Sequence, residues 1–215
     1  MKFEDINFNE IYKEQKEKSS FKTKSKEAWD KKAISMNQRV HNSIYNEQFL
    51  KQINLDGIES LLDVGCGVGN LSLIFAKKLK EVYSLDYSSK MLEILEENAK
   101  KGKLSNIKTI NKSWYEKWDD VPSADLVIAS RSMEVKDMKE ALLKLNEKAN
   151  KKVVVTYKVG GSFVSSEILD VLRREIIKKP DYIYLVNILY NLGINATVNF
   201  IQSEGRNTIY SSKDK

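Results

Sequence analysis

The sequence predicts an α/β fold, a doubly wound and mostly parallel sheet with helices on both faces and a helical lead-in at its N-terminal side. From residue 60 onward, short apolar runs alternate with longer segments of helical period, which is typical of parallel strands joined by helices. A glycine-rich turn follows the first of these apolar runs, as expected where a strand passes into a helix beside a ligand. The two prolines, Pro122 and Pro180, stand between predicted elements.

Composition predicts one domain with a buried core, because 41% of the 215 residues are hydrophobic. The net charge of +6 comes from lysines interspersed with acids, which favours a solvated surface and does not indicate a nucleic-acid partner. One cysteine, Cys66, rules out an internal disulfide and provides no metal cluster. No apolar run reaches the length of a membrane span and the start is too polar for a signal peptide, so we predict a cytoplasmic protein with no membrane partner.

The lead-in is predicted to be helical over residues 5–18 and about 24–53, where apolar side chains recur near helical spacing. We therefore divide the chain into a lead-in of residues 1–54 and a main domain of residues 55–215.

The main domain is predicted to contain five strands of short apolar or β-branched runs. They are residues 60–64, 81–86, 106–111, 124–130 and 152–158. Capping residues mark several of the helices between and after them. The predicted helices run from the glycine turn to about residue 78, from Ser88 or Ser89 to Lys101, over 137–149, and from about Asp181 to the stop at Gly193. Residues 195–203 are predicted to form a sixth strand.

The spacing of the glycines in this turn indicates which kind of ligand the turn could bind. Gly65, Gly67 and Gly69 would let the backbone approach a ligand that a Cβ would repel. A dinucleotide turn reads G-x-G-x-x-G, and here the third glycine comes one place early. Asp63 would also repel a pyrophosphate but suits a cationic ligand. The spacing therefore disfavours a nicotinamide-dependent oxidoreductase.

The segment DVGCGVG together with VYSLDYSSKML resembles the class I S-adenosylmethionine-dependent methyltransferases, over about residues 55–160. The resemblance implies a Rossmann-like fold of the methyltransferase type, with S-adenosylmethionine as cofactor and S-adenosylhomocysteine as product. It implies a set of cofactor-binding residues, namely Asp63, Gly65, Gly67, Gly69, Asp86, Tyr87, Met91, Ser113, Trp114 and Ser130.

Within the resemblance, Asp63 and the Gly65 carbonyl would face the ammonium of the methionine moiety. Asp86 would accept both ribose hydroxyls through its two oxygens; the alternative is a charge at the start of a helix. Tyr87 and Met91 would flank the adenine.

The position after the third strand departs from the family pattern, which often has an aspartate for the adenine amino group. Here Ser113 stands at that place with Trp114 beside it. Both would complete the adenine site, or Trp114 and Trp118 are core aromatics under a loop.

No dedicated catalytic residue is predicted, because an activated methyl donor mainly requires alignment and exclusion of water. Three residues are candidates for acid, base or substrate binding: His41, Arg131 and Tyr157. For His41 the alternative is a surface or capping role, and for Arg131 it is a surface pair with Glu134.

The function predicted from the resemblance is methyl transfer to an unidentified acceptor, with a small molecule favoured. A tRNA or rRNA methyltransferase and a non-catalytic S-adenosylmethionine-binding protein stay open as alternatives. In the family, a lead-in often lids the cofactor, and a seventh strand closes the sheet. Only residues 207–212 are left for that strand here, so it would be short.

Overall fold

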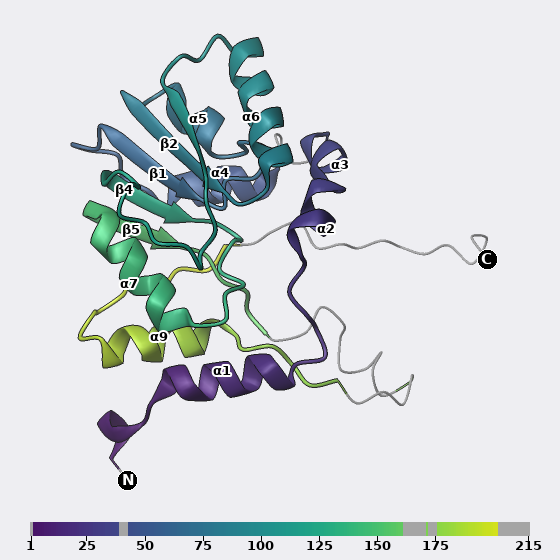
Figure 1. Cartoon of the computed structure of the whole chain (residues 1–215). Helices are drawn as coiled ribbons and strands as arrows, with labels where there is room; N and C mark the ends of the chain where they lie inside the picture. Colours follow the sequence, from purple (N-terminus) through teal and green to yellow (C-terminus); the bar gives the residue numbers. More distant parts are fainter. Residues whose placement is uncertain (1, 39–42, 161–170, 172–175, 202–215) are drawn as a thin grey trace.

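Five parallel strands form the centre of the computed structural model (Figure 1), which describes residues 2–38, 43–160, 171 and 176–201. The strands are β1 (Ser60–Val64), β2 (Glu81–Asp86), β3 (Ile107–Asn111), β4 (Ala124–Ala129) and β5 (Ala149–Val155). Their order across the sheet is β3-β2-β1-β4-β5, and every neighbouring pair is parallel. The predicted α/β class is therefore confirmed, and the chain reverses its winding direction between β1 and β4.

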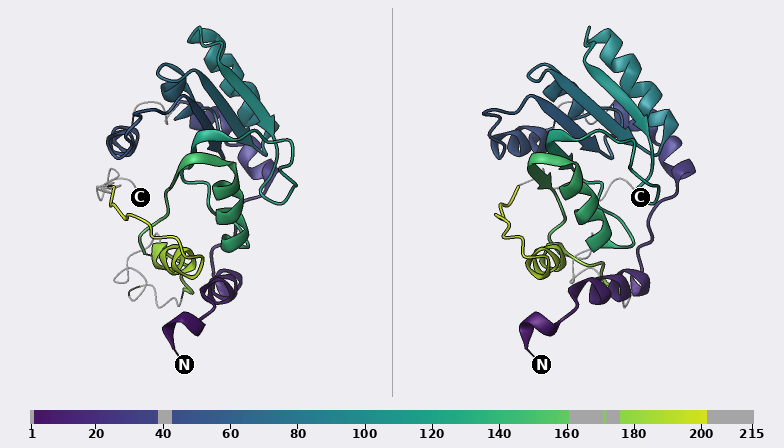
Figure 2. Two further views of the ribbon diagram at one scale, coloured as in Figure 1. Left: turned by 90° about the vertical axis from the view of Figure 1, so that its left-hand side faces the viewer. Right: turned by 60° about the vertical axis from the view of Figure 1, so that its left-hand side comes forward.

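Helices cover both faces of this sheet (Figure 2). Those described after the lead-in are α5 (Ser72–Ala76), α6 (Ser89–Lys101), α7 (Met138–Lys148) and α9 (Tyr182–Asn191). Successive side chains of a strand point to opposite faces, so Leu61 packs in one core with Phe75 of α5. Its neighbour Leu62 packs in the other core with Leu145 of α7 and Leu185 of α9.

The lead-in does not form the nearly continuous helix that its period predicts over residues 24–53. Its described elements are a short 3-10 helix at Phe3–Asp5, α1 (Phe8–Lys18), α2 (Lys26–Asp30), α3 (Ala33–Asn37) and α4 (Ile44–Lys51). The hydroxyls of Ser25 and Ser43 cap the starts of α2 and α4, and these local hydrogen bonds begin new helices. His41 lies outside the described residues.

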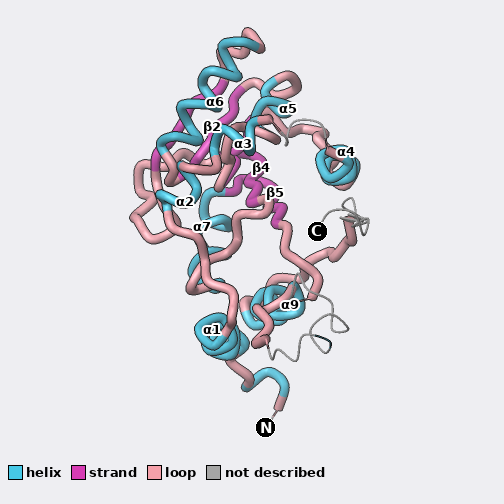
Figure 3. The backbone as a smooth tube through the Cα atoms, turned by 90° about the vertical axis from the view of Figure 1, so that its right-hand side faces the viewer, coloured by secondary structure: helices cyan, strands magenta, loops and turns pink. Residues whose placement is uncertain are grey.

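The lead-in contributes to both cores. Tyr12 of α1 is fully buried beside α7 and α9, while Phe49 of α4 is 1% exposed in the core on the opposite face. Figure 3 shows α1 next to α9 and α4 well apart from both. Between them, α2 and α3 pass along the carboxyl ends of the strands toward α6 (Figure 1).

The end of the described chain differs from expectation. The predicted helix start at about Asp181 is confirmed, and the Asp181 side chain caps α9 by accepting the Ile183 N–H. However, the predicted strand at 195–203 is wrong for its described part, because residues 194–201 form no strand. The ring of Phe200 lies 5.5 Å from that of Tyr182, so this segment packs toward α9 without a strand partner. Residues 207–212 lie outside the described part.

Within the described residues, no helix combines the length and the apolarity required to cross a membrane.

Candidate functional site

The glycine turn after β1 adopts a backbone conformation that favours glycine at all three positions. The φ angles of Gly65, Gly67 and Gly69 are +74°, +56° and +88°. A Cβ on Gly65 would lie 2.3 Å from Cβ of Ser132, and one on Gly69 would lie 2.8 Å from Cγ of Leu95. A Cβ on Gly67 would meet no described atom within 4 Å. Two of the glycines therefore allow close packing inside the protein, and Gly67 borders open space.

Asp86 joins this turn to the start of α6. One carboxylate oxygen accepts the Gly67 N–H and the other accepts the Ser88 N–H, both at 2.9 Å. The residue is 7% exposed; burial raises its pKa, and the backbone hydrogen bonds oppose that rise. Each oxygen keeps a further lone pair, so the bond to the helix start does not exclude a ligand.

Asp63 lies deeper than predicted, at 2% exposure. Its carboxylate accepts the Ser72 hydroxyl at 2.7 Å, and Ser72 in turn accepts the Ser84 hydroxyl at 2.9 Å. Burial raises the pKa of Asp63 to about 7, against the opposing hydrogen bond from Ser72. The carboxylate therefore has partners within the protein, at the start of α5, that the sequence analysis did not include.

The end of β3 places Asn111 opposite Asp86 in the sheet, and its side-chain amide donates to the Asp86 carbonyl at 2.9 Å. Asn111 was not among the predicted site residues; the signal that could have identified it is its place as the polar residue that closes the third strand. Ser113 instead forms a local turn, because its hydroxyl accepts the Tyr115 N–H at 3.3 Å and its own N–H donates to Glu116 at 2.6 Å.

The two tryptophans of this loop stack on each other, with ring centroids 5.3 Å apart. Trp118 is 4% exposed, as expected of a core aromatic. The indole N–H of Trp114 donates to the Ser132 carbonyl at 3.2 Å. This contact links the loop after β3 to the loop after β4.

The lead-in covers the start of α6. The Tyr87 hydroxyl donates to the Lys24 carbonyl at 3.4 Å, and the Ser88 hydroxyl donates to Asp30. Met91 is 2% exposed and packs in a small core with Ala33 of α3. Tyr87 and Met91 therefore lie between the end of β2 and the lead-in.

The end of β4 is tied to α4 through a tyrosine that the sequence analysis did not identify. The Tyr45 hydroxyl lies 2.6 Å from the Ser130 hydroxyl and 2.9 Å from that of Thr156. The Arg131 guanidinium lies 3.5 Å from the centre of the Tyr45 ring, within range of a cation–π interaction. The backbone of Arg131 is in the left-handed region, with φ of +58°. Bulky residues rarely adopt this conformation.

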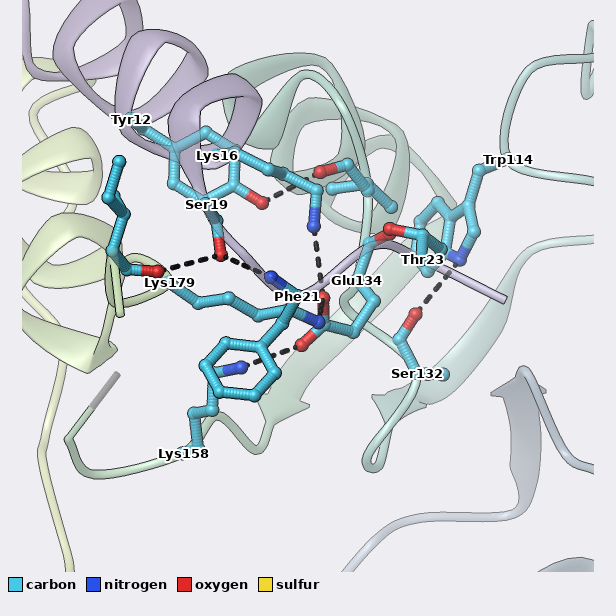
Figure 4. A network of polar contacts seen from close by, with 12 residues as sticks. Tyr12, Lys16, Ser19, Phe21, Thr23, Trp114, Ser132, Glu134, Lys158 and Lys179 are labelled. Carbon is cyan, nitrogen blue, oxygen red and sulfur yellow. Dashed lines mark hydrogen bonds and ion pairs between the residues drawn. The ribbon is translucent and has the colours of Figure 1, made fainter. Parts of the chain in front are cut away.

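Glu134 does not pair with Arg131, the alternative weighed for that arginine. It bonds the ammonium groups of Lys16, Lys158 and Lys179 at 3.0, 3.0 and 2.8 Å, as Figure 4 shows. Burial would raise the pKa of Glu134, but the lysines outweigh it and lower that pKa to about 2. We call these four residues the lysine cluster; they come from α1, the loop after β4, the segment after β5 and the segment before α9.

Tyr157 stands beside this cluster. Its hydroxyl oxygen is buried and has no hydrogen-bond partner in the part of the chain that the structure describes. Burial raises the pKa of Tyr157 above its ordinary value. The hydroxyl is therefore protonated at neutral pH and can donate a hydrogen bond, but it is a poor proton acceptor.

Comparison with known proteins identifies one family. A family model described as "Methyltransferase domain" matches residues 55–192. An uncharacterized protein of Haemophilus influenzae is 40% identical over 202 residues, which are 93% of this chain and 75% of that protein.

Two further relatives match over shorter stretches. A 23S rRNA (uracil(1939)-C(5))-methyltransferase of Aliivibrio fischeri is 36% identical over 34% of this chain and 17% of its own length. A probable cobalt-precorrin-6B C(15)-methyltransferase of Methanobrevibacter smithii is 30% identical over 46% of this chain and 53% of its own length. The chain thus spans about half or less of these two relatives.

Among solved structures, a SAM-dependent methyltransferase from Aquifex aeolicus has a similar fold. It is 18% identical with a TM-score of 0.53, and the match covers 80% of this chain and 90% of that one.

Proposed function

The chain belongs to the S-adenosylmethionine-dependent methyltransferases, and from that premise we propose that it methylates a small-molecule acceptor at the carboxyl edge of its sheet. The observation that carries the proposal is the pairing of Gly67 and Asp86. No atom of the described residues lies within 4 Å of a Cβ placed on Gly67, and the carboxylate that holds its N–H has acceptor capacity left for a ligand.

The cofactor fits this arrangement by its chemistry. Asp86 would accept ribose hydroxyls, for which carboxylate oxygens are suited. Gly67 would let the ligand approach the backbone. Asn111, which fixes the Asp86 carbonyl, is a positioning residue that we add to the predicted set. Asp63 would act through Ser72 at the start of α5, because its carboxylate is enclosed. Ser113 and Trp114 remain proposed contacts at the adenine side.

When bound, the cofactor supplies a methyl group activated by its sulfonium charge, so the protein needs to position the acceptor and exclude water. Ser130, Arg131 and Tyr45 form a fixed wall at the end of β4, since each is held by the others or by Thr156. The Tyr157 hydroxyl, which stays protonated because burial raises its pKa, is a further proposed contact. Arg131 and Tyr157 are thus assigned to substrate positioning, and no residue is assigned as general base.

A small acceptor is favoured over RNA by the distribution of positive charge. Many exposed lysines are paired with acids on the outer surface, as Lys80 is with Glu59 at 2.6 Å. Binding of an RNA backbone needs cations that are free to replace counterions. The relatives named for methylation include both an rRNA enzyme and a precorrin enzyme, so the acceptor class requires its own test.

The cofactor is tested by calorimetry with S-adenosylhomocysteine, with NAD as the comparison. We expect micromolar affinity or tighter, about −8 kcal/mol. Heat with NAD and none with S-adenosylhomocysteine would contradict the proposal.

The acceptor class is tested by incubating the protein and methyl-labelled S-adenosylmethionine with a cell extract split into small-molecule and RNA fractions. We expect label to appear in the small-molecule fraction and to resist ribonuclease. Label confined to the RNA fraction and released by ribonuclease would instead establish the rRNA or tRNA alternative.

A further inference from the structure

Arg131 follows Ser130 at the end of β4 in a backbone conformation that an arginine rarely adopts, with φ of +58°. In the described part of the chain, Lys103 is the other non-glycine residue with a positive φ, at +53°. Lys103 follows Gly102 just after α6, and such residues commonly end a helix. Arg131 follows a strand, so no helix end accounts for its conformation. Backbone strain of this kind clusters at active sites and ligand contacts.

Contacts on both sides of Arg131 fix this conformation. The Ser130 hydroxyl lies 2.6 Å from that of Tyr45. The Arg131 N–H donates to the Thr156 hydroxyl at 3.0 Å, and the Ser132 hydroxyl donates to the last carbonyl of β1 at 2.6 Å. The main chain around Arg131 is therefore tied to α4, to the segment after β5 and to the end of β1.

The side chain of Arg131 is exposed, yet Tyr45 holds it in place. Cζ of the guanidinium lies 3.5 Å from the centre of the Tyr45 ring, which is van der Waals contact. The ring is itself fixed, because Tyr45 is 7% exposed and its hydroxyl contacts both Ser130 and Thr156. The N–H donors of a guanidinium lie in its plane, so the ring covers one face and the donors project from the edges.

These donors lie on the side of the sheet away from the proposed ribose contact. Ligands of a parallel sheet bind beyond the carboxyl ends of its strands, and the strand order is β3-β2-β1-β4-β5. Asp86, the proposed ribose acceptor, ends β2. Arg131 follows β4 and stacks on Tyr45, whose hydroxyl reaches Thr156 after β5. The glycine turn after β1 therefore separates Arg131 from Asp86 in the strand order, as expected of an acceptor contact.

The chemistry of the guanidinium indicates an oxyanion as its ligand. Arginine binds carboxylate and phosphate groups through two parallel N–H bonds, and a side chain fixed before binding loses less conformational freedom. Glu134, the nearest acid along the chain, instead bonds Lys16 and Lys179 at 3.0 and 2.8 Å.

We propose that Arg131 binds a carboxylate or phosphate group of the methyl acceptor, and that the Tyr45 ring holds its guanidinium in place for this contact. The inference rests on the proposed function, because it names the chemical class of the acceptor at the same site. Arg131 is thereby the residue that selects acidic acceptors over neutral ones.

The test separates acidic from neutral acceptors before methylation. The small-molecule fraction of a cell extract is passed over an anion exchanger at alkaline pH, so that amino acids are also retained. The retained and unretained pools are then incubated with the protein and methyl-labelled S-adenosylmethionine. We expect label in the retained pool, and Arg131→Gln should lower its rate by about tenfold or more, as for loss of a charge-assisted hydrogen bond.

The matched control is Lys136→Gln. It removes an exposed cation from the same loop, where the Lys136 ammonium lies 5.8 Å from the centre of the Tyr115 ring, and it should label the retained pool at the wild-type rate. Label confined to the unretained pool would overturn the proposal, as would equal labelling of the retained pool by the wild type and Arg131→Gln.

Phosphatase treatment of the retained pool identifies the source of the oxyanion. Label that is lost after treatment supports a phosphorylated acceptor, and label that persists supports a carboxylic acid.

Arg131→Gly distinguishes the side chain from the backbone conformation. Glycine adopts a positive φ readily, so the melting temperature should not fall, whereas labelling of the retained pool should fall as in Arg131→Gln. Wild-type labelling by a folded Arg131→Gly would overturn the proposal. This variant also replaces Arg131→Gln if the latter does not fold.

The cofactor has a carboxylate of its own, which requires a separate measurement. S-adenosylhomocysteine and methylthioadenosine, which lacks the amino-acid part, are titrated by calorimetry into the wild type and Arg131→Gln. We expect each compound to bind the two proteins equally. Weaker binding of S-adenosylhomocysteine alone to Arg131→Gln would overturn the proposal in favour of a cofactor contact. Absence of S-adenosylhomocysteine binding to the wild type, or of label in both pools, contradicts the proposed function and with it this inference, whereas label in the unretained pool alone contradicts only the role of Arg131.

Discussion

Asp86 has two roles that can be separated by substitution, one in the protein and one toward the cofactor. Asp86→Ala removes the acceptor of the Gly67 and Ser88 N–H groups and the proposed acceptor of the ribose. We expect S-adenosylhomocysteine binding to weaken by about 2–3 kcal/mol, as for loss of a charged hydrogen-bond acceptor, with a lower melting temperature as well.

Calorimetry and thermal unfolding measure the two effects. Asp86→Asn should weaken binding less, because its amide keeps one acceptor oxygen. A lower melting temperature with unchanged affinity would show that Asp86 only anchors the turn and the helix start.

Substitution of Gly67 tests whether this residue borders the cofactor, and Gly57 provides a control with similar backbone strain. Gly67→Ala and Gly57→Ala both place a Cβ in open space at positive φ, +56° and +69°, so both should lose about 1 kcal/mol of stability. Only Gly67→Ala should weaken S-adenosylhomocysteine binding, because only that Cβ would meet the ligand. Denaturant unfolding and calorimetry check this, and equal affinity of the two variants would remove Gly67 from the site.

The raised pKa of Asp63 predicts how the stability of the fold depends on pH. Its pKa is about 7 in the folded protein against an ordinary 3.8, so the folded state binds more protons than the unfolded state between these values, and stability falls as pH rises through that window. Asp63→Asn cannot ionise and retains an acceptor for Ser72. We expect it to flatten this slope and to be more stable than the wild type above pH 7, by a few kcal/mol.

Urea unfolding at pH 5 and pH 8 measures the difference. A wild-type stability that rises over this range, with no gain in Asp63→Asn, would show that the carboxylate is stabilised in its charged form.

At the scale of elements, α1 is held to the domain through Tyr12. Its ring is fully buried and its hydroxyl donates to the Val135 carbonyl at 2.7 Å. Tyr12→Phe should lower the free energy of unfolding by about 1 kcal/mol, because the ring stays and a buried carbonyl loses its donor. Denaturant unfolding measures it, with Tyr190→Phe on the exposed side of α9 as a control. Equal effects of both changes would mean that α1 is not anchored by this bond.

Sequence patterns predicted β1, β2 and β4 well because these central strands are mostly buried, as expected of strands that are covered on two faces. Residues 60–64 and 81–86 match β1 and β2. β5 begins at Ala149 instead of residue 152, since Ala149 pairs with Ala124 of β4 and the strand includes the polar residues Asn150 and Lys151. Helical period alone did not show where the lead-in breaks, because those breaks depend on serine caps and on which core each piece enters.

At the scale of the whole molecule, the sequence predicted best those parts of the candidate site whose residues lie close together along the chain. The glycine turn and Asp86 lie close together along the chain. The lysine cluster joins residues 16, 134, 158 and 179, and Tyr45 reaches Ser130 across 85 positions. Such contacts arise from tertiary packing, and lysines in a chain rich in lysine carry no signal of their own. The cofactor therefore followed from the sequence, whereas contacts such as that of Tyr45 with Ser130 are seen only in the fold.

The path of the lead-in joins distant parts of the molecule and predicts how the protein responds to the cofactor. After α1, the chain pairs with the segment before α9, through the Ser20 N–H to the Ile177 carbonyl and the Ile177 N–H to the Ser20 hydroxyl, both at 3.1 Å. It then reaches the end of β2, where Lys24 and Asp30 contact Tyr87 and Ser88. We infer that residues 19–37 form a strap over the mouth of the cofactor site.

Binding of the cofactor beside Asp86 should stabilise this strap, because α2 and α3 have only five residues each and short helices depend on packing for their stability. Hydrogen exchange measured with and without saturating S-adenosylhomocysteine should therefore slow in residues 19–37 when the ligand is bound. Exchange in β1 and β4, which are central in the sheet, should change little and serves as the internal control. Asp86→Ala at the same ligand concentration should show no slowing of the strap. Identical exchange of residues 19–37 in the two states of the wild type, with binding verified by calorimetry, would show that the lead-in is a fixed part of the fold and does not close over the site.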